Sequence, residues 1–307
     1  MSVEKVRICR SEASYARAVP RDEQLIDPSA LYRELDDGEL RIIDATAFLR
    51  REVVDGPYTV ESGRSSYDEA HIPQAVFADI PGELSDRDSP FPFTLPRPES
   101  FARAMGELGV GPGTRVVAYS QDSPMWASRL WWLLRYFGFD DVRVLDGGLP
   151  AWLRAGFPVS SSLPTVKRAS FSAHPRPELL ATKDDVIAVV GGKEPACLLN
   201  ALSTRAFKGG GTAYIRPGRI PGSISAPAHD LVDPETGCFR PREDLARALF
   251  DLLGSEPATP VIAYCGGGIS ATVDIFVLFL LGRDDVRLYD GSLTEWSADP
   301  QLPLEVG

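Results

Sequence analysis

Hydrophobic and polar positions alternate along the chain in the way that is typical of strands followed by helices. Short apolar runs bounded by turn residues predict buried parallel strands at 41–45, 116–119, 196–200 and 261–264. Longer apolar or amphipathic stretches follow and predict helices at 101–109, 125–138, 244–254 and 271–282. This alternation predicts an α/β fold, in which helices cover both faces of a parallel sheet.

The same pattern occurs twice. VVAYS at 116–120 matches VIAYC at 261–265, which places Ser120 opposite Cys265. Two further pairs of segments recur in the same order and at nearly the same separation: DDVRVLDGGLPAW with DDVRLYDGSLTEW, and His71-Ile-Pro-Gln-Ala with Arg219-Ile-Pro-Gly-Ser. Such self-similarity is the signature of a duplicated domain.

The duplication divides the chain into four parts. Residues 1–24 form an N-terminal extension that includes Cys9, and 25–159 form the first domain. The polar, proline-containing stretch 160–178 is interpreted as a linker, and 179–307 as the second domain. At 307 residues with 44% hydrophobic residues, the chain is long enough for two such cores.

Charge and targeting signals narrow the classes of function. A formal net charge of -11 argues against nucleic acid as a partner, because duplex binding needs a basic surface. The longest apolar run, 275–281, is too short to span a membrane, and the charged N-terminus lacks the apolar segment of a secretion signal. The four cysteines show neither metal-ligand nor disulfide spacing. We therefore expect a soluble cytoplasmic protein without a metal.

Cys265 stands where a strand is predicted to end, three glycines follow it, and a helix is predicted next. Ligands of parallel α/β sheets bind at such strand ends. Glycines can turn backbone N–H groups inward to bind an anion, and the helix N-terminus adds partial positive charge, which favours a thiolate. A lone cysteine is more often a small core residue, and this remains our interpretation of Cys197 and Cys238.

One local stretch departs from the acidic average. Between 203 and 222 there are four basic residues and no acidic one, at Arg205, Lys208, Arg216 and Arg219. The stretch is either a solvated basic loop or a small site for an anion.

The tandem strand–loop–helix domains, the YCGGGISA loop, GRIPGS and YDGSLTEW together resemble the two-domain rhodanese-type sulfurtransferases. The resemblance covers about residue 25 to the end and implies tandem rhodanese-like domains, of which only the second is catalytic. It implies that Cys265 accepts sulfur as a persulfide, without a cofactor. A loop would cradle that sulfur, made of Gly266, Gly267, Gly268, Ile269, Ser270 and Ala271. The implied partners are a small anionic sulfur donor and an acceptor such as a thiol, cyanide or a thioredoxin-like protein.

Side chains around the loop bear on the donor. Three glycines after the cysteine resemble the small loop of 3-mercaptopyruvate enzymes more than the basic loop of thiosulfate enzymes, which favours 3-mercaptopyruvate over thiosulfate. For the donor's carboxylate the candidate cations are Arg205, Arg216 and Arg219. Arg219 stands where relatives often have His, whereas the first repeat keeps His71, a candidate for the interdomain cleft whose alternative role is structural.

Two other classes of function are open to comparison. The loop also resembles that of dual-specificity phosphatases, but those need an arginine where this chain has Ala271, so phosphatase activity is not expected. A rhodanese-like carrier or regulatory binding module is the non-catalytic alternative. Such modules commonly lose the cysteine that this chain retains.

Overall fold

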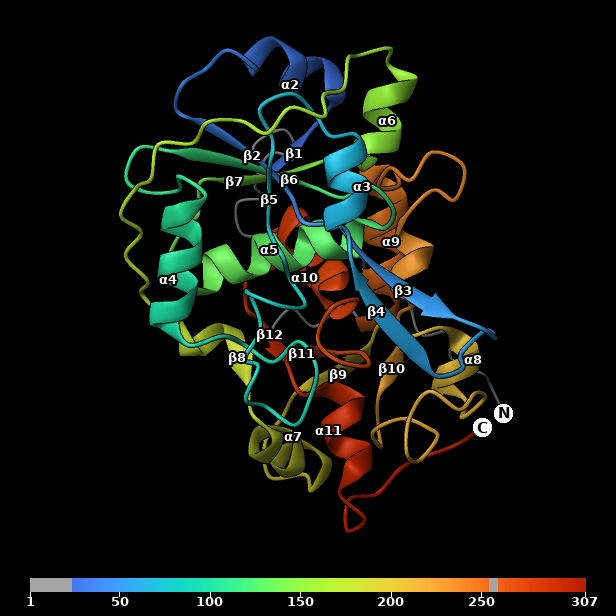
Figure 1. Ribbon diagram of the computed structural model, residues 1–307. Coiled ribbons are helices and arrows are strands. Elements are labelled where there is room, and N and C mark those ends of the chain that lie inside the picture. Colours follow the sequence, from blue (N-terminus) through green and yellow to red (C-terminus); the bar gives the residue numbers. More distant parts are fainter. Residues whose placement is uncertain (1–23, 254–258) are drawn as a thin grey trace, which may run out of the picture.

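The computed structural model describes residues 24–253 and 259–307 (Figure 1). The predicted N-terminal extension with Cys9 lies outside the described residues, except for its last residue, and so does the expected helix end at Gly254. Within these residues the strands form two five-stranded sheets and one two-stranded hairpin. Neighbouring strands in both large sheets are parallel.

The two sheets have the same strand order. The first runs β1 (Leu25–Ile26), β7 (Val142–Leu145), β6 (Arg115–Tyr119), β2 (Leu40–Asp44), β5 (Val76–Phe77). The second, from its corresponding edge, runs β8 (Leu180–Ala181), β12 (Val286–Tyr289), β11 (Val261–Tyr264), β9 (Cys197–Asn200), β10 (Ile224–Ser225). The predicted α/β class and the predicted duplication are both confirmed.

Helices cover both faces of each sheet, as expected for apolar strands that are buried on both sides (Figure 1). In the first half they are α2 (Pro28–Glu34), α3 (Arg64–Glu69), α4 (Pro98–Glu107), α5 (Pro124–Tyr136) and α6 (Gly148–Arg154). In the second half they are α7 (Lys183–Val190), α8 (Thr204–Phe207), α9 (Arg242–Leu253), α10 (Ala271–Leu280) and α11 (Ser292–Ala298). None of the helices in the described ranges has both the length and the apolar character needed to cross a membrane.

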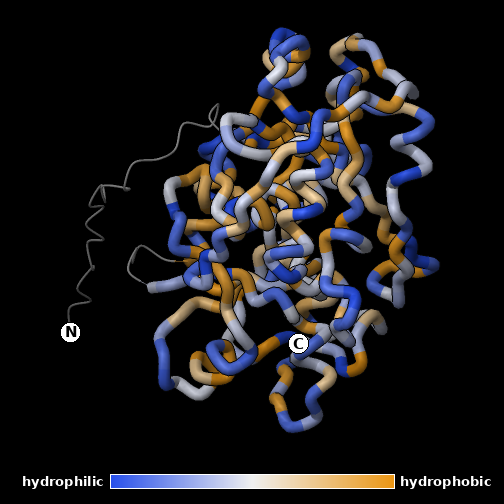
Figure 2. Tube along the Cα trace, turned by 60° about the vertical axis from the view of Figure 1, so that its left-hand side comes forward, coloured by the Kyte–Doolittle hydropathy of each residue, from blue (hydrophilic) through white to orange (hydrophobic). Residues whose placement is uncertain are grey.

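The two halves meet through their corresponding central helices, α5 and α10 (Figure 1). Ser128 on α5 and Thr272 on α10 occupy matching positions in the two repeats, and their hydroxyl oxygens are 2.9 Å apart. The Trp131 ring packs edge-on against Phe276 across the same contact, at 4.9 Å between centroids. One hydrophobic cluster contains buried residues of both halves, so the apolar interior is continuous between them. In Figure 2 hydrophobic residues, in orange, are seen along chain segments in the middle of the molecule.

Matching hydrogen bonds hold each half together. The Tyr119 hydroxyl accepts from the N–H of Ile72 in the first half, and the Tyr264 hydroxyl accepts from the N–H of Ile220 in the second. The stretch interpreted as a linker packs back onto the first half, where the Ala169 N–H donates to the Gly106 carbonyl at 2.9 Å.

One buried carboxyl group breaks the correspondence between α5 and α10. Asp274 on α10 is fully buried, and neither of its carboxyl oxygens has a hydrogen-bond partner among the described residues. Burial raises its pKa well above the usual range, because it disfavours the charged carboxylate relative to the protonated form. The matching residue of the first half is Leu130, which is also buried.

We expect Asp274→Leu to stabilise the protein at pH 7 by about 1–3 kcal/mol, because it removes an unpaired polar group. The pKa of Asp274 is higher in the folded than in the unfolded chain. The contribution of Asp274 to the free energy of unfolding is therefore most favourable below about pH 4, and it is lost as pH rises through the folded pKa. Urea unfolding measures this effect, and the stability gained by Asp274→Leu should shrink as pH falls towards 4. The control is Asp284→Leu, which changes an exposed carboxylate. No gain at pH 7, or one independent of pH, would contradict this account.

Candidate active site

Cys265 lies directly after β11, at the carboxyl end of the strand, and only 2% of its surface is exposed. Its carbonyl oxygen accepts from the N–H of Leu293 at 3.1 Å, and that of Gly266 accepts from the N–H of Thr294 at 2.9 Å. The cysteine loop is therefore fastened to the start of α11. The sequence predicted this strand-end position.

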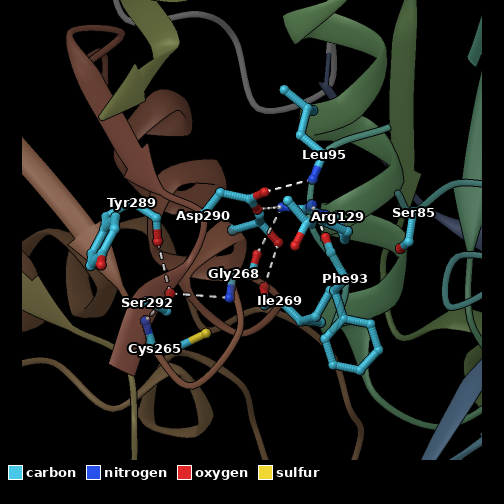
Figure 3. A network of polar contacts seen from close by, with 12 residues as sticks. Ser85, Phe93, Leu95, Arg129, Cys265, Gly268, Ile269, Tyr289, Asp290 and Ser292 are labelled. Atoms are coloured by element: carbon cyan, nitrogen blue, oxygen red, sulfur yellow. Dashed lines mark hydrogen bonds and ion pairs between the residues drawn. The ribbon is translucent and has the colours of Figure 1, made fainter. Parts of the chain in front are cut away.

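Ser292 fixes both ends of the first turn of the loop. Its hydroxyl oxygen accepts from the N–H of Cys265 and from the N–H of Gly268, each at 3.1 Å, and donates to the Tyr289 carbonyl at 2.8 Å (Figure 3). Ser292 has a φ of 51°, a left-handed conformation that costs energy for a residue with a side chain. The matching residue of the first half, Gly148, has a φ of 55°. The half that has the cysteine thus accepts strain at the residue that holds the cysteine loop.

Gly268 has no room for a side chain. Its φ is +75°, and a Cβ there would lie 2.6 Å from Asp290 Oδ1 and 2.9 Å from the Asp290 carbonyl. This close approach leaves the Gly268 carbonyl 3.1 Å from a guanidinium nitrogen of Arg129, which donates to it.

Arg129 comes from α5 of the first half and reaches into the second. It is fully buried and donates to Asp290 Oδ1 at 2.7 Å and to the Phe93 carbonyl at 2.7 Å (Figure 3). The other oxygen of Asp290 accepts from the N–H of Leu95 at 2.7 Å. The first half, although it lacks the cysteine, therefore holds the cysteine loop in place. Sequence reasoning missed Arg129, Asp290 and Ser292.

Five backbone N–H groups around Cys265 have no acceptor among the described residues; they belong to Gly266, Gly267, Ile269, Ser270 and Ala271. The sequence-based interpretation included Gly268, but its N–H donates to Ser292. The Ser270 hydroxyl contacts the sulfur of Met125 at 3.7 Å. The free N–H groups at the start of α10 can bind a small anion or an anionic sulfur atom.

Two tyrosine hydroxyls lie near the cysteine. Burial raises the pKa of Tyr58, and the negative charge of a Cys265 thiolate raises it further. The same two causes, burial first, raise the pKa of Tyr214 well above the usual range. Its hydroxyl occupies the space where a Gly266 side chain would be. Both phenols are therefore protonated at neutral pH and keep an O–H group beside the loop.

The structure corrects the interpretation of the basic loop. The Arg216 guanidinium donates to the backbone carbonyl of Ser297, near the end of α11, at 2.9 Å and to that of Leu302, beyond the helix, at 2.8 Å. Arg219 donates to the Gly307 carbonyl at 2.8 Å and pairs with Glu305 at 3.3 Å. Both guanidinium groups thus hold the C-terminal segment, and this geometry does not support donor binding by them. Arg205 lies exposed on α8, with its side chain against Gly210.

His71 does not line the interdomain cleft. It is fully buried in the first half, where its ring nitrogens lie 2.6 Å from the Tyr67 carbonyl and 3.2 Å from the Ser162 carbonyl. Its backbone pairs with Ser160, and the backbone of Arg219 pairs in the same way with Glu305. Each residue therefore fastens the segment that follows its own half. For His71 this contact is a structural role.

A cavity of about 450 Å³ opens between the halves. Its walls include Arg51, Asp55, Asp122 and Met125 from the first half, and Ser203, His229 and Ser270 from the second. Since Ser270 belongs to the cysteine loop, this cleft gives small molecules a place to bind beside the loop.

Comparison with known proteins yields consistent matches. The model of the Rhodanese-like domain matches residues 27–155 and 180–299. The chain is 34% identical over 283 residues to 3-mercaptopyruvate sulfurtransferase of Escherichia coli, covering 90% of this chain and 95% of that one. It is 32% identical over 321 residues to thiosulfate/3-mercaptopyruvate sulfurtransferase 1, mitochondrial, of Arabidopsis thaliana, covering 96% and 82%. The crystal structure of SseA from Escherichia coli, described as a 3-mercaptopyruvate sulfotransferase, aligns with a TM-score of 0.75 and 32% identity over 87% of this chain and 98% of that one.

Proposed function

The chain belongs to the rhodanese-like family of sulfurtransferases, and from this premise we propose that it moves sulfur from an anionic donor to a thiophilic acceptor through a persulfide on Cys265. We favour 3-mercaptopyruvate as donor, with thiosulfate next. The relatives named above carry both donors in their names, and 3-mercaptopyruvate is the one they share. The acceptor we propose is a thiol, cyanide or a thioredoxin-like protein.

The observation that carries the proposal is the set of unused N–H groups around a cysteine fixed at a strand end. A persulfide has a terminal sulfur that bears negative charge, and such N–H groups stabilise it without rearrangement. The neighbouring glycines leave the backbone itself in contact with that sulfur.

The first half-reaction transfers sulfur to the enzyme. The Cys265 thiolate attacks the sulfur of 3-mercaptopyruvate, an S–S bond forms, and the C–S bond breaks. Its electron pair leaves on carbon as the enolate of pyruvate, which takes up the proton that the donor thiol carried. With thiosulfate the S–S bond of the donor breaks instead, and sulfite leaves with the electron pair.

The second half-reaction returns the enzyme to its starting state. The acceptor thiolate attacks the outer sulfur of the persulfide, and the Cys265 thiolate leaves. The acceptor departs as a persulfide, so each half-reaction has its own leaving group, as in a ping-pong mechanism.

Intact-mass measurement after exposure to 3-mercaptopyruvate tests this proposal. We expect a mass gain of one sulfur atom that disappears on adding a thiol acceptor and does not form in Cys265→Ser. Pyruvate release against sulfite release separates the two donors. An adduct that no small thiol or thioredoxin removes would favour the non-catalytic carrier, whereas no adduct from either donor would overturn the proposal.

A further inference from the structure

Within the described parts of the chain, only the first half has a β-hairpin after its second strand, made of β3 (Ala47–Arg51) and β4 (Tyr58–Ser62). At the corresponding place of the second half, the described residues form α8 and a loop. The hairpin extends from the first half to α8 of the second (Figure 1). At its tip the Asp55 carbonyl accepts from the N–H of Thr212 at 2.9 Å, and Asp55 Oδ1 accepts from the Ser203 hydroxyl at 3.0 Å.

Arg51 is the cation that this hairpin brings to the second half. It faces Tyr58 in the strand register, and its guanidinium lies over the Tyr58 ring at 5.3 Å from the centroid. It is 3.7 Å from Asp55, which is a long ion pair, and 29% of its side chain is exposed. Among the described residues nothing accepts a hydrogen bond from it, so its donors remain available to a ligand.

Arg51 lines two cavities that adjoin residues of, or next to, the cysteine loop. It lines the large interdomain cavity together with Ser270 of that loop. It also lines a small cavity of about 20 Å³ together with Tyr214, whose hydroxyl packs against Gly266. Arg216 and Arg219, by contrast, line neither of these cavities and donate to backbone carbonyls.

The electrostatics agree with this placement. Burial is the main cause of the raised pKa of both Tyr58 and Tyr214, and the charge of Cys265 adds to it. The positive charge of Arg51 acts on the same two hydroxyls in the opposite direction. Arg51 and the cysteine therefore influence the same two hydroxyls, with opposite sign.

We propose that Arg51 binds the carboxylate of the sulfur donor, so that the half without the reactive cysteine supplies the substrate-binding cation. A planar guanidinium can hold a carboxylate with two parallel hydrogen bonds. Asp55 positions Arg51 by fastening the hairpin to Ser203 and Thr212. This inference rests on the proposed function, because it concerns the donor of that reaction.

Steady-state kinetics with 3-mercaptopyruvate tests the assignment through three variants. We expect Arg51→Ala to raise the KM for the donor by about 10- to 100-fold, as lost charged hydrogen bonds do, with kcat changed by less than about threefold. Arg51→Lys should recover part of the loss, because it keeps the charge but not the planar fork. Arg50→Ala is the matched control. Arg50 is the neighbour of Arg51 in the sequence, but its side chain is 56% exposed and pairs with Glu61 at the surface. The KM of this variant should equal that of the wild type.

The outcomes separate this inference from the proposed function. A KM within twofold of wild type in Arg51→Ala, in an enzyme whose Cys265 still gains sulfur, overturns the role of Arg51 alone. So does a fall in kcat at unchanged KM, which would show that the hairpin only supports the fold. If the wild type gains no sulfur from the donor, the proposed function is overturned and this inference with it.

Discussion

Cys265→Ser is expected to abolish sulfur transfer, by at least about 10³-fold in kcat, while the fold remains intact. A serine hydroxyl is a far weaker nucleophile than a thiolate and cannot form a persulfide. The site nevertheless tolerates serine, because Ser120 occupies the matching position of the first half and is likewise buried, at 4% exposure. Pyruvate release at saturating 3-mercaptopyruvate measures the first effect, and thermal unfolding the second.

The other described cysteines provide the controls. Cys197 on β9 and Cys238 in a turn are both half-buried, and the Cys238 thiol lies 3.8 Å from the Thr236 carbonyl. Neither belongs to the Cys265 loop, so Cys197→Ser and Cys238→Ser should retain activity within about twofold. Persistent turnover in Cys265→Ser, or its loss in either control, would place the transferred sulfur elsewhere.

Arg129→Met is expected to cost about 3–5 kcal/mol in the free energy of unfolding, as removal of one partner from a buried ion pair does. The substitution leaves Asp290 buried without its cation, and the carbonyls of Phe93 and Gly268 lose their donor. Because Gly268 belongs to the cysteine loop, activity should fall as well, in line with the effect of a displaced catalytic group. Urea unfolding measures the stability, and pyruvate release the activity.

Two further variants isolate this interaction. In Arg129→Met/Asp290→Asn the buried charge is gone, so the double variant should lose less stability than the two single variants together. Arg64→Met removes a surface ion pair with Asp68, in which both side chains are about half exposed, and should cost less than about 1 kcal/mol. If Arg129→Met costs no more than Arg64→Met, the interdomain network does not hold the loop.

Features that depend on local pattern could be predicted from the sequence. Apolar runs in the sequence predicted the strands β2, β6, β9 and β11. The repetition of these runs indicated two similar halves, with Ser120 and Cys265 at matching strand ends. This succeeds because buried parallel strands need continuous apolar runs, and each half must satisfy the same packing on its own sheet. The position of Cys265 follows from the strand that precedes it.

Features that depend on contacts between distant segments could not be predicted. Arg216 and Arg219 stand in a basic stretch, yet most of their partners are backbone carbonyls of α11 and the C-terminal segment, which carry no sequence signal. Nothing in the sequence distinguishes Arg129 from other charged residues in helices, because its partner Asp290 comes from the other half of the molecule. Ser292 belongs to a recognised repeat, but its left-handed backbone is visible only in the structure. In each case tertiary contacts decide the role of the side chain.

The contact between α5 and α10 pairs corresponding helices of the two halves within one chain. Matching surfaces of similar halves, with Ser128 against Thr272, form an interface of the kind found in symmetric dimers. Two separate cysteine-bearing halves could use that interface with each other, and the product would lack both Arg129 and the hairpin. A covalent connection keeps the unlike half at high effective concentration. Each chain therefore joins one half that carries Cys265 to one half that contributes Arg129 and the hairpin.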